Sequence, residues 1–545
     1  MTTGTDPNRI MFFSGSNFDP EVGRSGINCT EANAEVNNFR CSVHGTMPTP
    51  GYRYNGSSFT WPTLPDLLEA AGISWRIYQN PNDNWDGLMH GGLAFTSFRD
   101  ATVASGSPLY VNGMSDWSLD DLRSDVMAGT LPDVSWILPN ISQSEHPGGS
   151  NPVRAAQFIS EVLDALTSNP DSWSKTAFFL TFDENDGFFD HLPAPAVPSY
   201  DANGTLAGKS TVSLEGEYLS DPQFAYLLPQ DTISGNVRPW GLGARVPMLV
   251  LSPWSRGGWV NSQVFDHTSL ALFLEKRFGI EVQSISPWHR AVCGDLTSAF
   301  DFETPNASKL QPLPPVGNPS IVEAQQSSLP TPLPPASPLA PFQEPGPRPS
   351  RALPYELHTS ARPAAVGAIS LTFSNTGRQG AVFHVYDKLH LDRIPRRYTV
   401  EAGKTLSDVW DATQADYGNY DLCVYSTNGF FRSFRSDAAT LSRGAFKPEV
   451  AVFYQPGAGQ MSLNVYNTGT QAGQVVVRSN AYRSDGPWTV DVRPRAVGRL
   501  QWNLEKSTNW YDFTVQSTGF ERRFAGRMET GRPGLSDPAM SRDLA

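Results

Sequence analysis

The chain has 545 residues, of which 39% are hydrophobic, and a net charge of −13. Its length and apolar content are typical of a globular protein of roughly two to four domains, and they exclude an intrinsically disordered chain. The acidic balance argues against a nucleic-acid partner, and no run of about 18 apolar residues predicts a transmembrane segment.

The first stretch with the composition of a functional site is TTGTDPNR, at residues 2–9. It combines three threonine hydroxyls with a glycine, and its Pro7-Asn8 pair suits a turn that starts a helix. Such a stretch is typical of a loop that holds reactive groups at the start of a helix.

The four cysteines form no CxxC motif, so zinc ligation by them is not expected. Cys29 and Cys41 lie close enough in sequence to form a disulfide in an oxidising compartment. Two buried free thiols explain the same pair equally well, so both alternatives stay open.

The next elements alternate between helical and strand patterns. Residues 63–79 read as a helix, a glycine and a strand, and residues 151–166 carry apolar side chains at helical spacing after Pro152. TAFFLTF (176–182) and VPMLVL (246–251) are continuous apolar runs, as in strands covered on both faces of a parallel sheet. We therefore predict an α/β sandwich around a mainly parallel sheet, with ligands at the carboxyl ends of its strands.

One of these strands ends directly in an acidic stretch, TFDENDGFFDH (181–191). Its carboxylates repel one another unless a cation or a proton compensates. Hard oxygen ligands favour Ca²⁺, Mg²⁺ or Mn²⁺, so a metal site is the leading interpretation. The alternative is an acidic surface loop, which the two phenylalanines within the stretch make less attractive.

Three carboxylate–histidine pairs fall where a loop meets a helix or leaves a strand: Glu145-His146, Asp190-His191 and Asp266-His267. An acidic neighbour can orient an imidazole or raise its pKa, which suits an acid, a base or an anion ligand. Taken singly, each pair is better explained as structural, for instance with Asp266 or Thr268 capping a helix at 265–279 in which Leu270, Phe273, Leu274 and Phe278 face inward. The recurrence of the pair favours a shared site.

A proline-rich segment at residues 308–352 predicts a linker or an extended surface strap. Beyond it, AISLTFSNTGRQGAVFHVYD (368–387) is repeated as MSLNVYNTGTQAGQVVVRSN (461–480), and residues 420–434 are repeated at 511–524. Alternating apolar residues between Asn/Gly turns predict short antiparallel strands. We expect a catalytic domain at 1–307, the linker at 308–352, and two small β-sandwich repeats at 353–440 and 441–535, which serve as accessory or binding modules.

The motifs TGTDPNR, EHP, FDENDGFFDH, SPWSRGG and FDHTS, in this order, resemble the bacterial phosphocholine-specific phospholipase C family. That family is grouped with acid phosphatases among the alkaline-phosphatase-like enzymes. The linker and the repeats resemble its paired C-terminal β domains, so the resemblance covers nearly the whole chain. It implies a phosphoester hydrolase with an alkaline-phosphatase-like fold and a covalent intermediate.

The resemblance also assigns site residues. The T-x-P-N spacing implies that Thr5 is the nucleophile, with Thr2 and Thr3 as less well spaced alternatives, and that Asn8 donates to a phosphoryl oxygen. Asp183 and Glu184 correspond to ligands of one divalent metal ion, with Ca²⁺ among the candidates for its identity; such an ion would stabilise a threonine alkoxide. Around the phosphoryl group the resemblance places His146, His191 and His267 as acids or oxyanion donors, and Glu145, Asp190 and Asp266 as substrate-binding residues.

The sequence departs from the family pattern before Thr5. Family members carry an upstream strand with a Glu-Asn pair that completes the metal site, and before it an export leader, usually of the twin-arginine type. Neither is found in these 545 residues, so we expect the sequence to begin inside a longer reading frame. The resemblance implies a secreted or periplasmic protein.

Three functions therefore compete. The first is a phospholipase C that releases phosphocholine from phosphatidylcholine, and from sphingomyelin as a second substrate, at a membrane surface. The second is an acid phosphatase that acts on phosphate monoesters, and the third is an inactive fragment whose β repeats only bind. The repeats favour the phospholipase, while the oligomeric state stays open.

Overall fold

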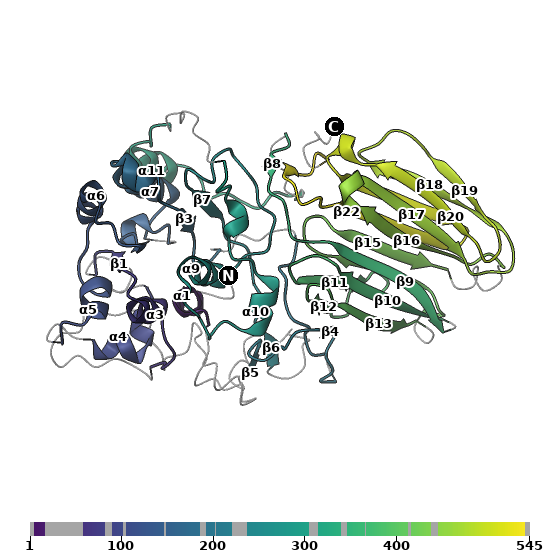
Figure 1. Cartoon of the computed structure of the whole chain (residues 1–545), viewed down its shortest axis with the longest axis horizontal. Helices are drawn as coiled ribbons and strands as arrows, with labels where there is room; N and C mark the ends of the chain where they lie inside the picture. The colour runs from purple at the N-terminus through teal and green to yellow at the C-terminus, as the bar shows by residue number, and fades with distance from the viewer. Residues whose placement is uncertain are drawn as a thin grey trace.

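The computed structural model places an α/β part and a β-rich part at opposite ends of the molecule (Figure 1). In the β-rich part both repeats lie side by side (Figure 1). No helix among the described residues is both long enough and apolar enough to cross a bilayer. The structure describes residues 5–16, 58–81, 90–101, 105–146, 149–185, 192–201, 203–220, 237–304, 314–338, 346–365, 367–412, 416–437 and 445–539.

The α/β part contains short strands between helices. Its helices are α1 (Thr5–Ser14), α3 (Leu64–Ala71), α4 (Thr96–Asp100), α5 (Pro108–Gly113), α6 (Leu119–Ala128), α7 (Pro152–Leu166), α8 (Pro170–Trp173), α9 (Thr268–Phe278) and α10 (Pro287–Val292). Its strands are β1 (Trp75–Tyr78), β2 (Val134–Ile137), β3 (Phe178–Thr181), β4 (Gly208–Ser210), β5 (Tyr218–Ser220), β6 (Val237–Pro239) and β7 (Met248–Leu251).

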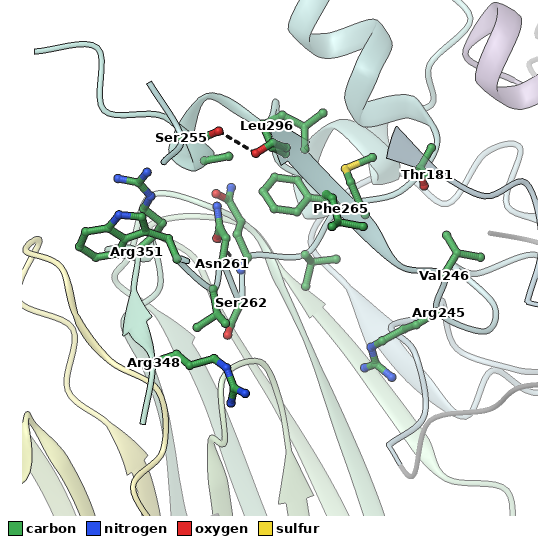
Figure 2. A pocket seen from close by; sticks show the side chains of 18 of the residues that line it. Thr181, Arg245, Val246, Ser255, Asn261, Ser262, Phe265, Leu296, Arg348 and Arg351 are labelled. Atoms are coloured by element: carbon green, nitrogen blue, oxygen red, sulfur yellow. Dashed lines mark hydrogen bonds between the residues drawn. The ribbon is translucent and has the colours of Figure 1, made fainter. Parts of the chain in front are cut away.

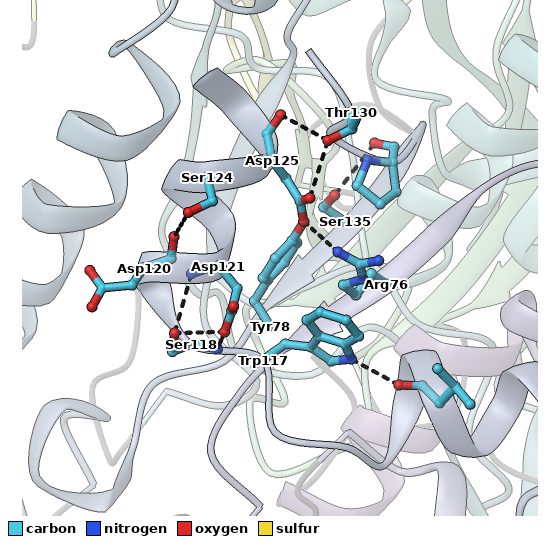
Figure 3. A network of polar contacts seen from close by, with 12 residues as sticks. Arg76, Tyr78, Trp117, Ser118, Asp120, Asp121, Ser124, Asp125, Thr130 and Ser135 are labelled. Atoms are coloured by element: carbon cyan, nitrogen blue, oxygen red, sulfur yellow. Dashed lines mark hydrogen bonds and ion pairs between the residues drawn. The ribbon is translucent and has the colours of Figure 1, made fainter. Parts of the chain in front are cut away.

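The helix, glycine and strand predicted at residues 63–79 are confirmed as α3, Gly72 and β1. Thr63 and Asp66 form a capping box at the start of α3, and Gly72 ends the helix with a φ of 69°. β1 then pairs in parallel with β2. β1 is tied to α6 because Tyr78 and Arg76 both bind the carboxylate of Asp125 (Figure 3).

The two continuous apolar strands behave differently from the prediction. β3 and β7 pair with each other, but antiparallel, with Phe178 opposite Leu251. The strands are also less covered than predicted, because the residues of β3 are only partly buried and Leu249 of β7 is half exposed. Strand direction depends on the connections, which an apolar run does not encode. The α/β class therefore holds, with parallel pairing in β1–β2.

Helix α9 forms where it was predicted, but different side chains are fully enclosed. Thr268, Ser269 and Ala271 are the buried residues of α9, whereas the four larger apolar side chains predicted to face inward are only partly covered. Phe273 among them packs edge to face against Phe179 of β3. The small residues allow the start of α9 to approach its neighbours closely, which matters for the site at that end.

The strands predicted from the C-terminal repeats are confirmed. The first repeat contains β9 (Leu357–Ala365), β10 (Ala368–Asn375), β11 (Ala381–Asp387), β12 (Arg396–Val400), β13 (Thr405–Asp411), β14 (Tyr420–Tyr425) and β15 (Phe431–Ser436). The second contains β16 (Pro448–Gln455), β17 (Gln460–Asn467), β18 (Gly473–Ala481), β19 (Trp488–Val492), β20 (Val497–Asn503), β21 (Trp510–Ser517) and β22 (Phe520–Arg527).

The repeats are joined into a single sheet, which the sequence did not predict. β15 pairs antiparallel with β22, so one nine-stranded sheet runs through both repeats and ends in β4 of the α/β part. Each repeat adds a three-stranded sheet, β13-β10-β9 or β16-β17-β20. Pairing β15 with β22 leaves neither repeat with an open edge at the junction.

Two equivalent arginines connect the repeats across the β15–β22 junction. Arg432 of β15 donates to the hydroxyl of Tyr511 at 2.9 Å, and Arg522 of β22 donates to the hydroxyl of Tyr420 at 2.8 Å. Both guanidinium groups are buried, and each binds the tyrosine of the other repeat. The exchange gives the pair of repeats an approximate two-fold symmetry and ties them together.

The proline-rich segment is more structured than a linker. It contains helix α11 (Pro319–Ser327), whose Glu323 accepts hydrogen bonds from Arg154 and Asn151 at the start of α7. Near its end, strand β8 (Pro349–Ser350) pairs with β23 (Gly534–Leu535). The predicted boundaries at 307/308 and 440/441 lie outside the described residues, and the division into domains stays a prediction.

Candidate functional site

Thr5 is the first residue of helix α1, which is ten residues long. The unpaired N–H groups of a first helical turn and the helix dipole make such an end favourable for a negatively charged group. The Thr5 hydroxyl donates a hydrogen bond of 3.2 Å to Oε2 of Glu184. A hydroxyl is therefore held between a helix N-terminus and a carboxylate.

The carboxylates that follow β3 lie against the same helix. Asp183 Oδ2 accepts a hydrogen bond of 2.9 Å from Nε of Arg9, and its Oδ1 accepts the backbone N–H of Glu184 at 3.0 Å. Arg9 and Asp183 are only partly exposed, so their charges interact more strongly than those of a surface pair. Arg9 thus offsets part of the repulsion between the two adjacent carboxylates.

His267 approaches this group from the start of α9. Its Nε2 lies 2.9 Å from the backbone carbonyl oxygen of Asp183, and because a carbonyl only accepts, Nε2 carries the proton. Burial lowers the pKa of His267 to about 4. The neutral ring therefore offers Nδ1 as an acceptor, and its edge-to-face contact with Phe12 of α1, at 5.9 Å between ring centres, fixes its orientation.

A buried ion pair, Asp266 with His289, lies next to His267. Asp266 Oδ1 accepts from the backbone N–H and the hydroxyl of Thr268. Asp266 thus pairs one N–H at the start of α9, although the N-cap residue itself is His267, which makes no side-chain cap hydrogen bond. Oδ2 of Asp266 lies 2.7 Å from Nδ1 of His289, whose Nε2 lies 3.5 Å from Glu217. These contacts fix the backbone at Asp266, and therefore the position of the neighbouring His267.

The pKa values of this pair move in opposite directions. Burial alone would raise the pKa of Asp266, but the charge of His289 and the Thr268 hydrogen bond outweigh it and hold that pKa below its usual range. Burial lowers the pKa of His289, yet Glu217 and Asp266 raise it well above its ordinary value. His289 is therefore an imidazolium between two carboxylates.

Comparison with known proteins places this arrangement in a family. Residues 1–281 match the model of the Phosphoesterase family, and residues 349–436 and 448–527 match that of the bacterial phospholipase C C-terminal domain. The chain belongs to the phosphoesterase family. The resemblance inferred from the order of the motifs is therefore confirmed.

Relatives of this phosphoesterase span nearly all of the chain. A non-hemolytic phospholipase C of Pseudomonas aeruginosa is 46% identical over 98% of this chain and 74% of the relative. A non-hemolytic phospholipase C of Burkholderia pseudomallei is 40% identical over 99% of this chain and 75% of the relative. A hemolytic phospholipase C of Pseudomonas aeruginosa is 38% identical over 98% of this chain and 75% of the relative.

The metal ligands of the phosphoesterase were predicted at Asp183 and Glu184. Asp183 and Glu184 are adjacent in the sequence and the Thr5 hydroxyl contacts Glu184, so all three offer hard oxygen donors of the kind that suits a divalent cation such as Ca²⁺, Mg²⁺ or Mn²⁺. These donors fit such an ion in kind, while Asp183 already accepts hydrogen bonds from Arg9 and from the Glu184 backbone, and the assignment of both residues as ligands stays a prediction.

Two further clusters of the described residues bring three ligand-type side chains together: Asp266, His289 and Cys293, and Asp387, His390 and Asp416. The first is better explained as an ion pair, because His289 is protonated and burial raises the pKa of the Cys293 thiol to about 12. The second lies in the first β repeat, where Arg393 already binds Asp387.

The other predicted site residues are placed as follows. Asn8 is fully buried in α1, with its role untested. Glu145 and His146 are partly buried on the loop between the 3₁₀ turn Ile141–Gln143 and α7, where Glu145 has a φ of 65°. Asp190, His191, Thr2, Thr3 and the Cys29–Cys41 pair lie outside the described residues.

Arg9 was not among the predicted site residues of the phosphoesterase. The signal was present, because Arg9 lies four residues after Thr5 and this spacing puts both side chains on one face of a helix. His289 and Glu217 gave no such signal, because their only local neighbours are ordinary helix and loop residues. Their pairing with Asp266 depends on the tertiary structure.

Proposed function

We propose that this phosphoesterase is a phospholipase C that hydrolyses the phosphodiester of phosphatidylcholine, with sphingomyelin as a second substrate, and releases phosphocholine. The observation that carries the proposal is the hydrogen bond from Thr5 to Glu184 at the N-terminus of α1, beside Arg9 and Asp183. A hydroxyl nucleophile, a carboxylate partner and a nearby positive charge, here Arg9, are groups that phosphoryl transfer uses.

In the proposed reaction the Thr5 oxygen forms a bond to phosphorus while the bond from phosphorus to the glycerol oxygen breaks. The Thr5 proton passes to Glu184, the leaving oxygen takes up a proton from solvent and departs as diacylglycerol, and the phosphocholine group stays on Thr5. Water then attacks phosphorus, which frees phosphocholine and restores the hydroxyl. Glu184 accepts the hydrogen bond that orients Thr5, and the N–H groups of α1 face the phosphoryl oxygens.

His267 contributes by position and by its protonation state. Its Nε2–H is committed to the carbonyl of Asp183, so the neutral ring keeps the acidic loop in place against α1. The other ring nitrogen, Nδ1, can accept a proton or a hydrogen bond. As an acid for the leaving group it would first have to be protonated, which burial disfavours.

The proposed site includes one divalent cation held by Asp183 and Glu184. Bound there, the ion would lower the pKa of the Thr5 hydroxyl and offset negative charge on the phosphoryl oxygens. On the basis of the family resemblance, we further propose that the protein is secreted or periplasmic and acts at a phospholipid surface.

Two other functions are tested by the same assay. An acid phosphatase would use the same nucleophile on a monoester, and a binding-only protein would use its repeats without turnover. The bacterial phospholipase C C-terminal domain in this chain favours the phospholipase over the phosphatase. Nothing in the geometry of Thr5 and Glu184 favours a binding-only role.

The experiment measures phosphocholine release from phosphatidylcholine vesicles and phosphate release from p-nitrophenyl phosphate, in the presence of Ca²⁺, Mg²⁺ or Mn²⁺. We expect release from the vesicles that is lost in Thr5→Ala and kept in Thr470→Ala, a threonine exposed in the turn between β17 and β18. Turnover of the monoester alone would establish the phosphatase. Vesicle binding without turnover of either substrate would establish the binding-only role.

A further inference from the structure

A cavity of about 1970 Å³ lies between the α/β part and the first β repeat. Asp266 and His267 line it on the α/β side, and strands β11 and β14 of the first repeat line it on the other, through Tyr386 and Tyr425 among others. Arg245, Phe265 and Arg351 are further lining residues and lie around the same space (Figure 2). His267 therefore contacts the acidic loop with Nε2 and also borders this cavity.

The wall formed by the first repeat has no counterpart in the second. Tyr386 and Tyr425 contact each other edge to face, with ring centres 5.8 Å apart. At the same register in the second repeat stand Arg478 and Gln516, whose side chains join in a hydrogen bond of 2.7 Å near solvent. The two repeats therefore differ at these equivalent positions. The first repeat has aromatic side chains towards the cavity, and the second has polar side chains near solvent.

The same wall holds polar atoms that the protein leaves unsatisfied. His384 and Thr427 are among the residues that line the cavity, and their Nδ1 and Oγ1 atoms are buried without a hydrogen-bond partner among the described residues. The wall therefore combines aromatic rings with two unsatisfied groups.

The charged residues near this wall indicate which kind of ligand could bind there. Burial first, and then the positive charges of Arg397 and Arg245, lower the pKa of His384 to about 3, so this ring is neutral. A quaternary ammonium group next to these arginines would be repelled. An uncharged group with apolar chains avoids this repulsion and suits contact with the two tyrosine rings.

We propose that the Tyr386–Tyr425 face of the first repeat binds the acylglycerol part of a diacyl phospholipid whose phosphate lies at the His267 end of the cavity. The inference rests on the proposed phospholipase function and adds a role for the first repeat in substrate selection. The cavity is far larger than a phosphate monoester needs, and its size suits a ligand that continues beyond the phosphate.

The test compares two substrates with the same head group. Phosphatidylcholine in mixed micelles carries the acylglycerol part, and p-nitrophenyl phosphocholine lacks it. For Tyr386→Ala and Tyr425→Ala we expect the ratio of kcat/KM for the diacyl substrate to kcat/KM for the acyl-free substrate to fall about tenfold, because an apolar contact is lost with only one of them. Tyr425→Phe should keep the ratio.

The matched controls are Arg478→Ala and Gln516→Ala, which make the equivalent changes in the second repeat and should leave the ratio unchanged. An unchanged ratio in both tyrosine variants, or an equal fall in the control variants, would overturn the inference. A direct measurement separates this outcome from failure of the proposed function: wild-type protein should bind dihexanoylglycerol, and Tyr386→Ala should weaken that binding. Binding of dihexanoylglycerol that is unaffected by either tyrosine change, or absent from the wild type, also overturns it.

Discussion

The hydroxyl of Thr5 lies 3.2 Å from Oε2 of Glu184, although 179 residues separate them in the sequence. The contact joins the first turn of α1 to the end of β3 and places a hydroxyl nucleophile beside a carboxylate. The proposed attack of Thr5 on phosphorus depends on that juxtaposition.

Replacing Glu184 by glutamine tests the carboxylate. Glutamine keeps the size of the side chain but removes the negative charge that orients Thr5 and would bind a cation, so we expect kcat/KM for phosphatidylcholine to fall about 10²–10³-fold. The exposed Glu303→Gln is the control and should retain activity. Wild-type kinetics in Glu184→Gln would remove Glu184 from the site.

Arg9 is expected to matter through its charge and its contact with Asp183. Arg9→Gln should lower kcat about 10–100-fold, because Asp183 loses its counter-charge and the phosphoryl group loses a nearby cation. Arg9→Lys should recover part of this loss, since it keeps the charge without the guanidinium geometry. Arg154→Gln, which breaks a partly exposed pair with Glu323, should leave kcat unchanged; equal effects of the two glutamine variants would indicate a general loss of stability.

Removal of metal ions should abolish phosphocholine release, and addition of a divalent cation should restore it. Asp183→Asn should raise the cation concentration needed for half-maximal recovery, because one of its ligands is weakened. Asp387→Asn, in the cluster of the first repeat, should leave that concentration unchanged. The reverse pattern would place the functional cation in the repeat.

The His289 ion pair predicts a pH-dependent stability. A histidine in the unfolded chain has a pKa of about 6.5, and Glu217 and Asp266 hold the folded-state pKa well above its ordinary value despite burial. The stabilisation is therefore complete below pH 6.5 and is lost as the pH rises through the folded-state pKa. His289→Gln should lower the free energy of unfolding by about 3–5 kcal/mol at pH 6 and by less at pH 9.

The control for this effect is His390→Gln. His390 lies at the same 2.7 Å from Asp416 but is partly exposed, and such pairs contribute only about 0–1 kcal/mol. Chemical denaturation of both variants at the two pH values measures the difference. A loss in His289→Gln that does not change between pH 6 and pH 9 would contradict a charged His289.

The sequence predicted elements with strong local patterns and missed those set by distant contacts. The helix at α7 follows from Pro152 and its apolar spacing, and the C-terminal strands follow from their alternation. The direction of β3 against β7 and the fusion of the repeats through β15 and β22 depend on chain connections, which no local pattern carries.

The same division applies to the site. Thr5 and Glu184 were assigned together because the order of several motifs resembles a known family, and not because their contact follows from either segment alone. Arg9 was detectable from its helical spacing to Thr5. Glu217 and His289 were not, since only the folded chain brings them to Asp266.

The most direct test is to trap the covalent intermediate. Wild-type protein is mixed with phosphatidylcholine, quenched with acid within one turnover, digested and analysed by mass spectrometry. We expect a phosphocholine adduct on the peptide that contains Thr5, absent from Thr5→Ala, which should also lose phosphocholine release. An adduct on another residue, or undiminished turnover by Thr5→Ala, would contradict the assignment of Thr5 as the nucleophile.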